Sequence, residues 1–179
     1  MRVYFDYNAT TPPSPEVADR VSTVTREVFG NASSVHHFGQ QAKAAVDEAR
    51  SGVSALLGAD PSEVVFTGGG TESDNFAVRG IADAAEANGR KHLVATAIEH
   101  EAVLNTFKAL AKRGWRTTLI PVDASGIVDV QRVADAFADD TALVSVMHAN
   151  NEIGTLQPVA EIAALARARG IVVHTDAVQ

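Results

Sequence analysis

The chain has 179 residues, of which 46% are hydrophobic and 21% charged, a composition typical of a folded domain or of part of a larger protein. Its 15 basic and 22 acidic residues give a net charge of −7, which argues against a broad binding surface for nucleic acid or anionic lipid. The absence of cysteine excludes disulfides, thiolate metal sites and a thiol nucleophile within these residues. No apolar run approaches the length of a membrane span, so a cytoplasmic protein is the default expectation.

Helical and strand-like patterns alternate along most of the chain. Apolar residues recur at three- and four-residue spacing in six stretches, which predicts helices at 17–29, 40–57, 72–87, 101–113, 130–138 and 159–169. Short aliphatic runs predict strands at 64–67, 92–98, 117–122, 142–148 and 171–175. Several of these runs are continuously apolar, as in strands that are covered on both faces. The sequence therefore predicts an α/β fold, a mainly parallel sheet with helices on both faces.

The two ends of the chain depart from this alternation. Two helices precede the strands, so we expect residues 1–60 to form an N-terminal arm with helices and residues 61–179 to form the sheet domain. The last ten residues, from Gly170 to Gln179, have the pattern of a buried strand that nothing follows. We therefore expect a truncated chain whose sheet domain is incomplete at the C-terminus; the alternative is an edge strand at a genuine terminus.

Polar residues and glycines follow each of the predicted strands. In open parallel sheets, ligands bind at the carboxyl ends of the strands. This rule selects 68–71, 99–100, Asp123, 150–151 and Asp176. Asp123 stands in an ordinary turn sequence, whereas the other four positions are candidates for a binding site.

The segment Thr67–Ser73, TGGGTES, joins a predicted strand to a predicted helix. Its glycines allow a ligand to approach the backbone, and the amides at the start of a helix favour an anion. It is neither the dinucleotide pattern nor a Walker loop. The segment predicts a phosphate cradle that includes the Thr71 hydroxyl, or else a tight turn in which Thr71 caps the helix.

His100 lies between a strand end and a helix start, where the helix dipole disfavours the charged imidazolium. A neutral ring there could stack on a flat cofactor or pass protons, or it could only cap the helix. No pair of histidines has metal-ligand spacing on one helix, so no metal site is expected. Asn150 and Asn151 either form a turn or place an amide donor against a ligand oxygen.

Asp176 follows a buried aliphatic run, where a carboxylate is costly unless it is paired. A protonated ring nitrogen is a suitable partner, and the alternative role is that of a helix cap. A phosphate cradle, a stacking ring, an amide and a carboxylate together suit pyridoxal phosphate (PLP) better than a nucleotide. The expected cofactor is therefore PLP.

Six segments in order along the chain resemble the motif series of the cysteine desulfurases, which are class V aminotransferases of the fold-type I PLP enzymes. The segments are 6–11 (DYNATT), 30–34 (GNASS), 67–75 (TGGGTESDN), 99–104 (EHEAVL), 148–154 (HANNEIG) and 174–179 (HTDAVQ). The resemblance implies that residues 61–179 are the PLP-binding large domain, cut before the lysine that would hold the cofactor.

The same resemblance implies roles for the matched residues. Gly70 and Thr71 would bind the PLP phosphate, and His100 would stack on the pyridine ring as the catalytic residue of this half. Asp176 would pair with the ring nitrogen, and Gln179 would form a hydrogen bond to the phenolic oxygen of the ring.

The reaction that the resemblance implies converts L-cysteine to L-alanine and passes sulfur, as a persulfide, to an acceptor in iron–sulfur cluster assembly or nucleic-acid thiolation. Asn151 would lie beside the cofactor and the substrate. The expected partners are L-cysteine, a second copy of the chain in a homodimer and a sulfur-acceptor or scaffold protein; no membrane and no direct nucleic-acid ligand are expected.

Three functional residues of the family have no match in the chain. The lysine that anchors the cofactor would lie beyond Gln179, and the four lysines present stand outside the matching motif: Lys43, Lys91, Lys108 and Lys112. The persulfide cysteine and the arginine for the substrate carboxylate also belong to the second half. The 179 residues alone are therefore expected to be inactive.

Other functions fit the same residues. A selenocysteine lyase would share every site residue, and a non-catalytic half could serve in dimerisation or as a scaffold. A nucleotide-binding domain is disfavoured, because no acidic ribose ligand stands about twenty residues after the glycine segment.

Overall fold

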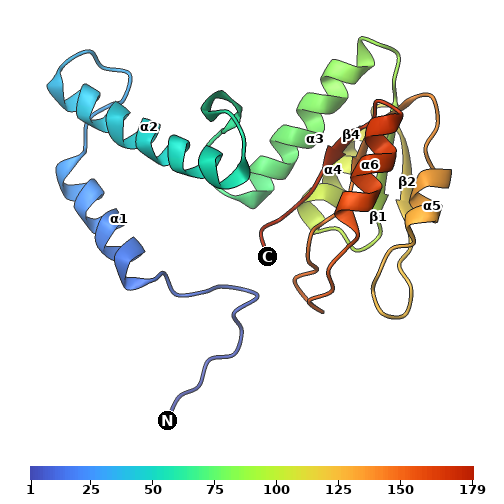
Figure 1. Ribbon diagram of the computed structural model, residues 1–179, viewed down its shortest axis with the longest axis horizontal. Coiled ribbons are helices and arrows are strands. Elements are labelled where there is room, and N and C mark those ends of the chain that lie inside the picture. Colours follow the sequence, from blue (N-terminus) through green and yellow to red (C-terminus); the bar gives the residue numbers. More distant parts are fainter. The chain divides into compact units, whose positions relative to one another are not determined.

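The computed structural model describes residues 1–179, which divide into two compact units, Met1–Phe66 and Thr67–Gln179. The first unit contains α1 (Pro15–Glu27), α2 (His37–Leu57) and the 3₁₀ turn η1 (Pro61–Glu63). The second contains the whole sheet, and most of its elements are labelled in Figure 1. The predicted division at residue 60 stays a prediction. None of the helices combines the length and the apolar character that crossing a bilayer requires.

The helices of the first unit have clear start and stop signals. Ser14 caps α1 by accepting a hydrogen bond from the Val17 N–H, and Pro15 occupies the first turn, where its missing N–H does no harm. Gly58 ends α2 with a φ of 65°, a left-handed conformation that a glycine adopts without strain. The sequence patterns therefore located both helices to within three residues.

The strand predicted at 64–67 is wrong. The Val64 carbonyl accepts a hydrogen bond from the Arg50 guanidinium, which also lies 5.1 Å over the Phe66 ring. Val65 and Phe66 are exposed by 58% and 49%, respectively. The apolar run therefore has the composition of a strand, but local partners hold it and no neighbouring strand pairs with it.

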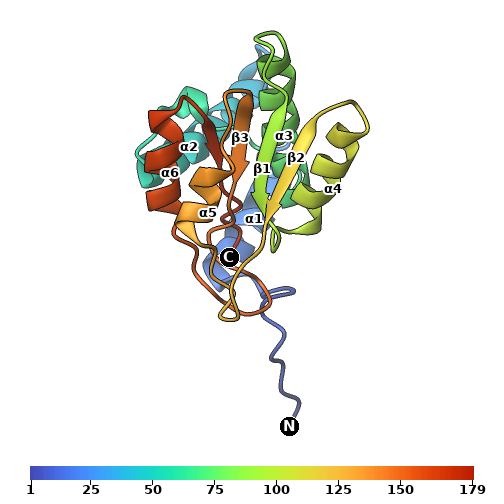
Figure 2. The ribbon, with the colours of Figure 1, turned by 90° about the vertical axis from the view of Figure 1, so that its right-hand side faces the viewer.

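The second unit is a four-stranded sheet whose strands are all parallel. The strands are β1 (His92–Thr96), β2 (Arg116–Ile120), β3 (Thr141–Ser145) and β4 (Val172–His174), in the spatial order β2-β1-β3-β4. Figure 2 shows β3, β1 and β2 side by side, with α5 and α6 to the left of the strands and α4 to the right. The connecting helices are α3 (Gly70–Glu86), α4 (Glu101–Ala111), α5 (Val130–Asp135) and α6 (Val159–Ala168). The predicted α/β fold with a parallel sheet is confirmed.

Each face of the sheet carries its own apolar core. Leu93 of β1 packs in one cluster with Val78 of α3 and Phe107 of α4. The neighbouring Val94 packs in a second cluster with Ile162 of α6. Because successive side chains of a strand point to opposite faces, helices cover both sides, as the continuously apolar strands predicted.

The parallel arrangement places the carboxyl ends of the strands at one edge of the sheet. Glu99 and His100 follow β1, the turn at 150–151 follows β3, and Asp176 follows β4. The start of α3 reaches the same edge, because Gly70 and Asp74 line one hollow with Asp176. The fold thus gathers residues that lie about a hundred positions apart in the sequence.

Replacing Ile162 by alanine should lower the free energy of unfolding by about 2–5 kcal/mol, because the side chain is fully buried and leaves a cavity. Urea unfolding followed by circular dichroism measures the change. Leu165→Ala on the same helix is the matched control; its side chain is 41% exposed, and its loss should be well below that of Ile162→Ala. Equal losses would contradict the assignment of Ile162 to the core.

Candidate functional site

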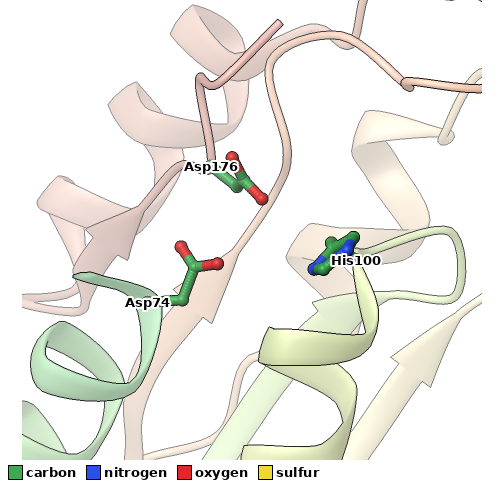
Figure 3. Close-up of side chains that lie close together, drawn as sticks. All are labelled: Asp74, His100 and Asp176. Carbon is green, nitrogen blue, oxygen red and sulfur yellow. The ribbon is translucent and has the colours of Figure 1, made fainter. Parts of the chain in front are cut away.

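Three side chains from separate elements converge at the carboxyl edge of the sheet. Asp74 lies near the start of α3, His100 precedes α4, and Asp176 follows β4. Figure 3 shows the three side chains turned toward one another, and their nearest nitrogen and oxygen atoms all lie within 4.8 Å. The sequence predicted His100 and Asp176 as site residues. Asp74 was missed, because a carboxylate within a helical pattern gives no sign of burial.

The start of α3 is open to an anion. The helix begins at Gly70, and no side chain caps its first N–H groups. The Gly68 N–H donates instead to the Glu72 carboxylate at 2.6 Å, and the Thr67 hydroxyl lies 2.6 Å from that of Ser73. Thr71 lies inside the first turn, so its alternative role as the helix cap is wrong. Free amides at a helix start, beside a threonine hydroxyl, suit a phosphate group.

A hollow of about 410 Å³ adjoins this helix start, lined among others by Gly70, Asp74, His174 and Asp176. A β-carbon placed on Gly70 would stand 3.2 Å from the Val178 side chain, closer than most such contacts. Glycine at this position therefore lets the segment after β4 pack closely against the start of α3.

His100 caps α4, since its Nδ1 accepts a hydrogen bond from the Ala102 N–H at 3.1 Å. This capping role was one of the two that the sequence allowed. When the ring is neutral, this bond leaves the proton on Nε2. The ring also lines a hollow of about 280 Å³ with Thr71, so it has an exposed face near the start of α3. The cap fixes the orientation of the His100 ring, and the exposed face of the ring can still stack on a flat ligand.

Asp176 is only 9% exposed, and Asp74 only 5%. One Asp176 oxygen accepts a hydrogen bond from the Val178 N–H at 3.1 Å. Asp74 Oδ1 lies 3.4 Å from His174 Nε2. Burial, which is the largest cause, and the negative charge of Asp176 raise the pKa of Asp74, and His100 opposes the rise; together they bring it to about 6. The two carboxyl groups are therefore electrostatically coupled.

Glu99 lies behind this cluster and is only 4% exposed. Its carboxylate accepts hydrogen bonds from the Thr96 hydroxyl at 2.5 Å, the Met147 N–H at 2.8 Å and the Ser145 hydroxyl at 3.0 Å. Burial raises its pKa, and these three donors oppose the rise. Ser145 also lies 2.8 Å from His174 Nδ1, which links Glu99 to the cluster. Burial lowers the pKa of His174.

The paired asparagines have different surroundings. Asn150 is buried, and its Oδ1 accepts from the N–H groups of Glu152 and Ile153, so it holds the turn. Asn151 is half-buried, and its amide donates to Glu152 at 3.3 Å. Gln179 is exposed at the end of the chain. The roles of Asn151 and Gln179 beside a cofactor stay predictions.

The chemistry of this donor set fits PLP. The amides of α3 and the Thr71 hydroxyl suit its phosphate, the His100 ring suits its flat pyridine ring, and the buried carboxylate of Asp176 suits a protonated ring nitrogen. Asp74, His100 and Asp176 also offer atoms that a metal ion could bind. The expectation of no metal site stays a prediction.

Fold and site together define a parallel α/β protein whose clustered side chains suit a phosphorylated, nitrogen-containing ring. The family model for aminotransferase class-V proteins matches residues 3–179. The chain therefore belongs to the aminotransferase class-V family, a family of PLP-dependent enzymes.

Individual relatives agree with this assignment. The chain is 46% identical over 177 residues to the cysteine desulfurase IscS of Dictyoglomus turgidum, covering 99% of this chain and 45% of the relative. A solved NifS-like protein has a TM-score of 0.95 at 40% identity, covering 100% of this chain and 49% of the other. The structure of SspA in complex with cysteine has a TM-score of 0.92 at 39% identity, covering 98% and 50%. The chain thus spans about half the length of these relatives.

Replacing Asp74 by asparagine should change how stability depends on pH. A carboxyl group whose pKa rises on folding from 3.8 to about 6 stabilises the folded state fully below pH 3.8 and loses this contribution as the pH rises through 6. The free energy of unfolding of the unmodified protein, relative to that of Asp74→Asn, should therefore fall between about pH 4 and pH 6.5 and then stay level. Urea unfolding at successive pH values measures it.

The matched control is Asp83→Asn, which makes the same change on an exposed face of α3, where Asp83 pairs with Arg113. It should leave the pH profile of stability close to that of the unmodified protein. A constant difference between the unmodified protein and Asp74→Asn across this range would show that Asp74 has an ordinary pKa.

Proposed function

We propose that the full-length protein is a PLP-dependent cysteine desulfurase, which converts L-cysteine to L-alanine and passes the sulfur, as a persulfide, to an acceptor. The observation that carries this proposal is the convergence of Asp176 and His100 beside the uncapped start of α3. The similarity to a cysteine desulfurase and to a protein solved in complex with cysteine supports the choice of reaction and substrate.

The residues would divide the work of holding the cofactor. Gly70 and Thr71 bind the phosphate, using the backbone amides of α3 and the threonine hydroxyl. His100 stacks on the ring, held in place by its bond to the Ala102 N–H. Asp176 pairs with the ring nitrogen, which keeps that nitrogen protonated.

Bound PLP supplies an electron sink that makes cleavage of the Cβ–S bond of cysteine feasible. The chain itself supplies orientation and charge. Asp176, held by the Val178 N–H, presents a fixed negative charge, and the burial of this carboxylate strengthens its attraction to a cation. Asn151 would lie beside the substrate, and Gln179 would donate to the phenolic oxygen of the ring.

The wider setting forms part of the same proposal. The enzyme would act as a homodimer in the cytoplasm and deliver sulfur to an acceptor or scaffold protein for iron–sulfur clusters or for thiolated nucleic acid. Lys91 forms an ion pair with Glu86, and Lys108 donates to Asn105, so the contacts of these lysines lie away from Asp176. We therefore propose that the 179 residues alone do not catalyse the reaction.

The purified full-length protein should show a visible absorbance band of bound PLP and should release alanine from L-cysteine. Absorbance spectroscopy and amino-acid analysis measure the two properties. A protein that shows no band, even after PLP is added, would rule out the desulfurase function.

Replacing Asp176 by alanine should weaken PLP binding and reduce turnover by at least about a hundredfold, because the ring nitrogen loses the charge that keeps it protonated. PLP titration followed by absorbance, together with alanine release, gives both values. Asp139→Ala, at an exposed position, is the control and should match the unmodified protein. An unchanged turnover in Asp176→Ala would exclude the proposed pairing.

Replacing Thr71 by alanine should lower the affinity for PLP about tenfold, the value of one lost hydrogen bond to a charged group. The same PLP titration measures it. Thr71→Ser keeps the hydroxyl and should restore most of the affinity. If both variants weaken binding equally, the hydroxyl does not bind the phosphate.

A further inference from the structure

A chain of four polar side chains runs from the core to the edge of the site. It starts at Glu99, continues through Ser145 and His174, and ends at Asp74. The contacts are 3.0 Å from the Ser145 hydroxyl to Glu99 Oε2, 2.8 Å from that hydroxyl to His174 Nδ1, and 3.4 Å from His174 Nε2 to Asp74 Oδ1. Glu99 and Asp74 are buried, and the side chain of His174 is only 10% exposed.

The protons that these four side chains carry determine whether a proton lies between His174 Nε2 and the Asp74 carboxyl group. Ser145 has one hydroxyl proton, which it can donate to Glu99 or to His174. If it donates to Glu99, then His174 Nδ1 must carry a proton and donate to Ser145, and Nε2 of a neutral ring is a bare acceptor. A bare Nε2 facing an ionised Asp74 would repel it, so Asp74 must hold a proton in that arrangement.

The chain has a second arrangement with the same number of protons. Protonated Glu99 donates to Ser145, Ser145 donates to His174 Nδ1, and the Nε2–H of His174 faces ionised Asp74, with 3.4 Å between Nε2 and Oδ1. Every proton has moved one step along the chain, so each contact again has a proton on one side and a lone pair on the other. The Thr96 hydroxyl and the Met147 N–H donate to Glu99 Oε1 in both arrangements. One negative charge therefore rests either at Glu99 or at Asp74.

We propose that Asp74, His174, Ser145 and Glu99 form a proton relay that positions a second negative charge beside the ring nitrogen of the cofactor. A protonated ring nitrogen at Asp176 attracts the charge of the relay to the Asp74 end, since Asp74 and Asp176 lie on the same side of the site. Without that cation, the repulsion between the two carboxylates favours the Glu99 end. The relay rests on the proposed function, because its cation is the PLP ring.

The groups that face Asp74 come from three directions. His174 and Asp176 approach from β4 and the segment after it, and His100 approaches from the start of α4. Glu99 acts through Ser145 of β3. Burial and the negative charge of Asp176, opposed by His100, together raise the pKa of Asp74 to about 6, so below this pH the Asp74 end of the relay is protonated and carries no negative charge. Affinity for PLP should therefore rise as the pH rises through 6.

The test is a double-mutant cycle on PLP affinity in the full-length protein, with Asp74→Asn and Ser145→Ala. Asp74→Asn cannot accept the charge, and Ser145→Ala cuts the relay. Each change should lower PLP affinity about tenfold, and the double variant should be no weaker than either single one, because both disable the same path. Absorbance titration with PLP between pH 5 and pH 8 measures affinity, and both variants should lose the rise near pH 6.

Additive losses of about a hundredfold in the double variant, or a pH profile that neither change moves, would overturn the relay. Should Asp74→Asn fail to fold, Ser145→Ala alone decides, by moving or not moving the pH profile. Asp83→Asn is the control on the same helix and should keep both affinity and profile. If the unmodified protein does not bind PLP, the proposed function fails; if it binds PLP and the cycle is additive, only the relay fails.

Discussion

Buried negative charge is the constraint on which the second unit depends. Glu99, Asp74 and Asp176 are each less than a tenth exposed, yet all three lie at one edge of a parallel sheet. Such groups are tolerated only with donors or with a cation. Glu99 accepts hydrogen bonds from three donors of the protein itself, whereas Asp176 accepts one, from the Val178 N–H. The imbalance between the back and the front of the cluster suits a front that faces a positively charged ligand.

The sheet holds these charged groups at defined positions around the candidate site. Its hydrogen bonds and two apolar clusters fix the strands, so the loops at their carboxyl ends are held at defined positions. His100 is held by its own helix start, and Asp176 by the turn that follows β4. The packing of the sheet and its helices thus offsets the repulsion between the carboxylates that it brings together.

Much of this arrangement could be predicted from the sequence, because periodicity and strand-end rules act locally. The helices, the four strands and the placement of His100 and Asp176 followed from them. The strand predicted at residues 64–67 was wrong, since an apolar run forms a strand only if a partner strand lies beside it. Asp74 was missed for the opposite reason: its burial arises from β4, about a hundred residues later, and no local pattern records it.

The start of α3 also sets a fixed spacing between Gly70 and Asp74. Gly70 and Asp74 are separated by one helical turn, which is about 6 Å along the axis, and in the proposed complex with PLP they would face opposite ends of the cofactor. One residue added or removed between them would rotate Asp74 by about 100° and turn it away from His174. In that proposed complex, substitutions in this turn would adjust the affinity for PLP, whereas the number of residues in the turn would have to match the length of the cofactor. Insertions and deletions should therefore be far less tolerated here than in the exposed turns at the other end of the sheet.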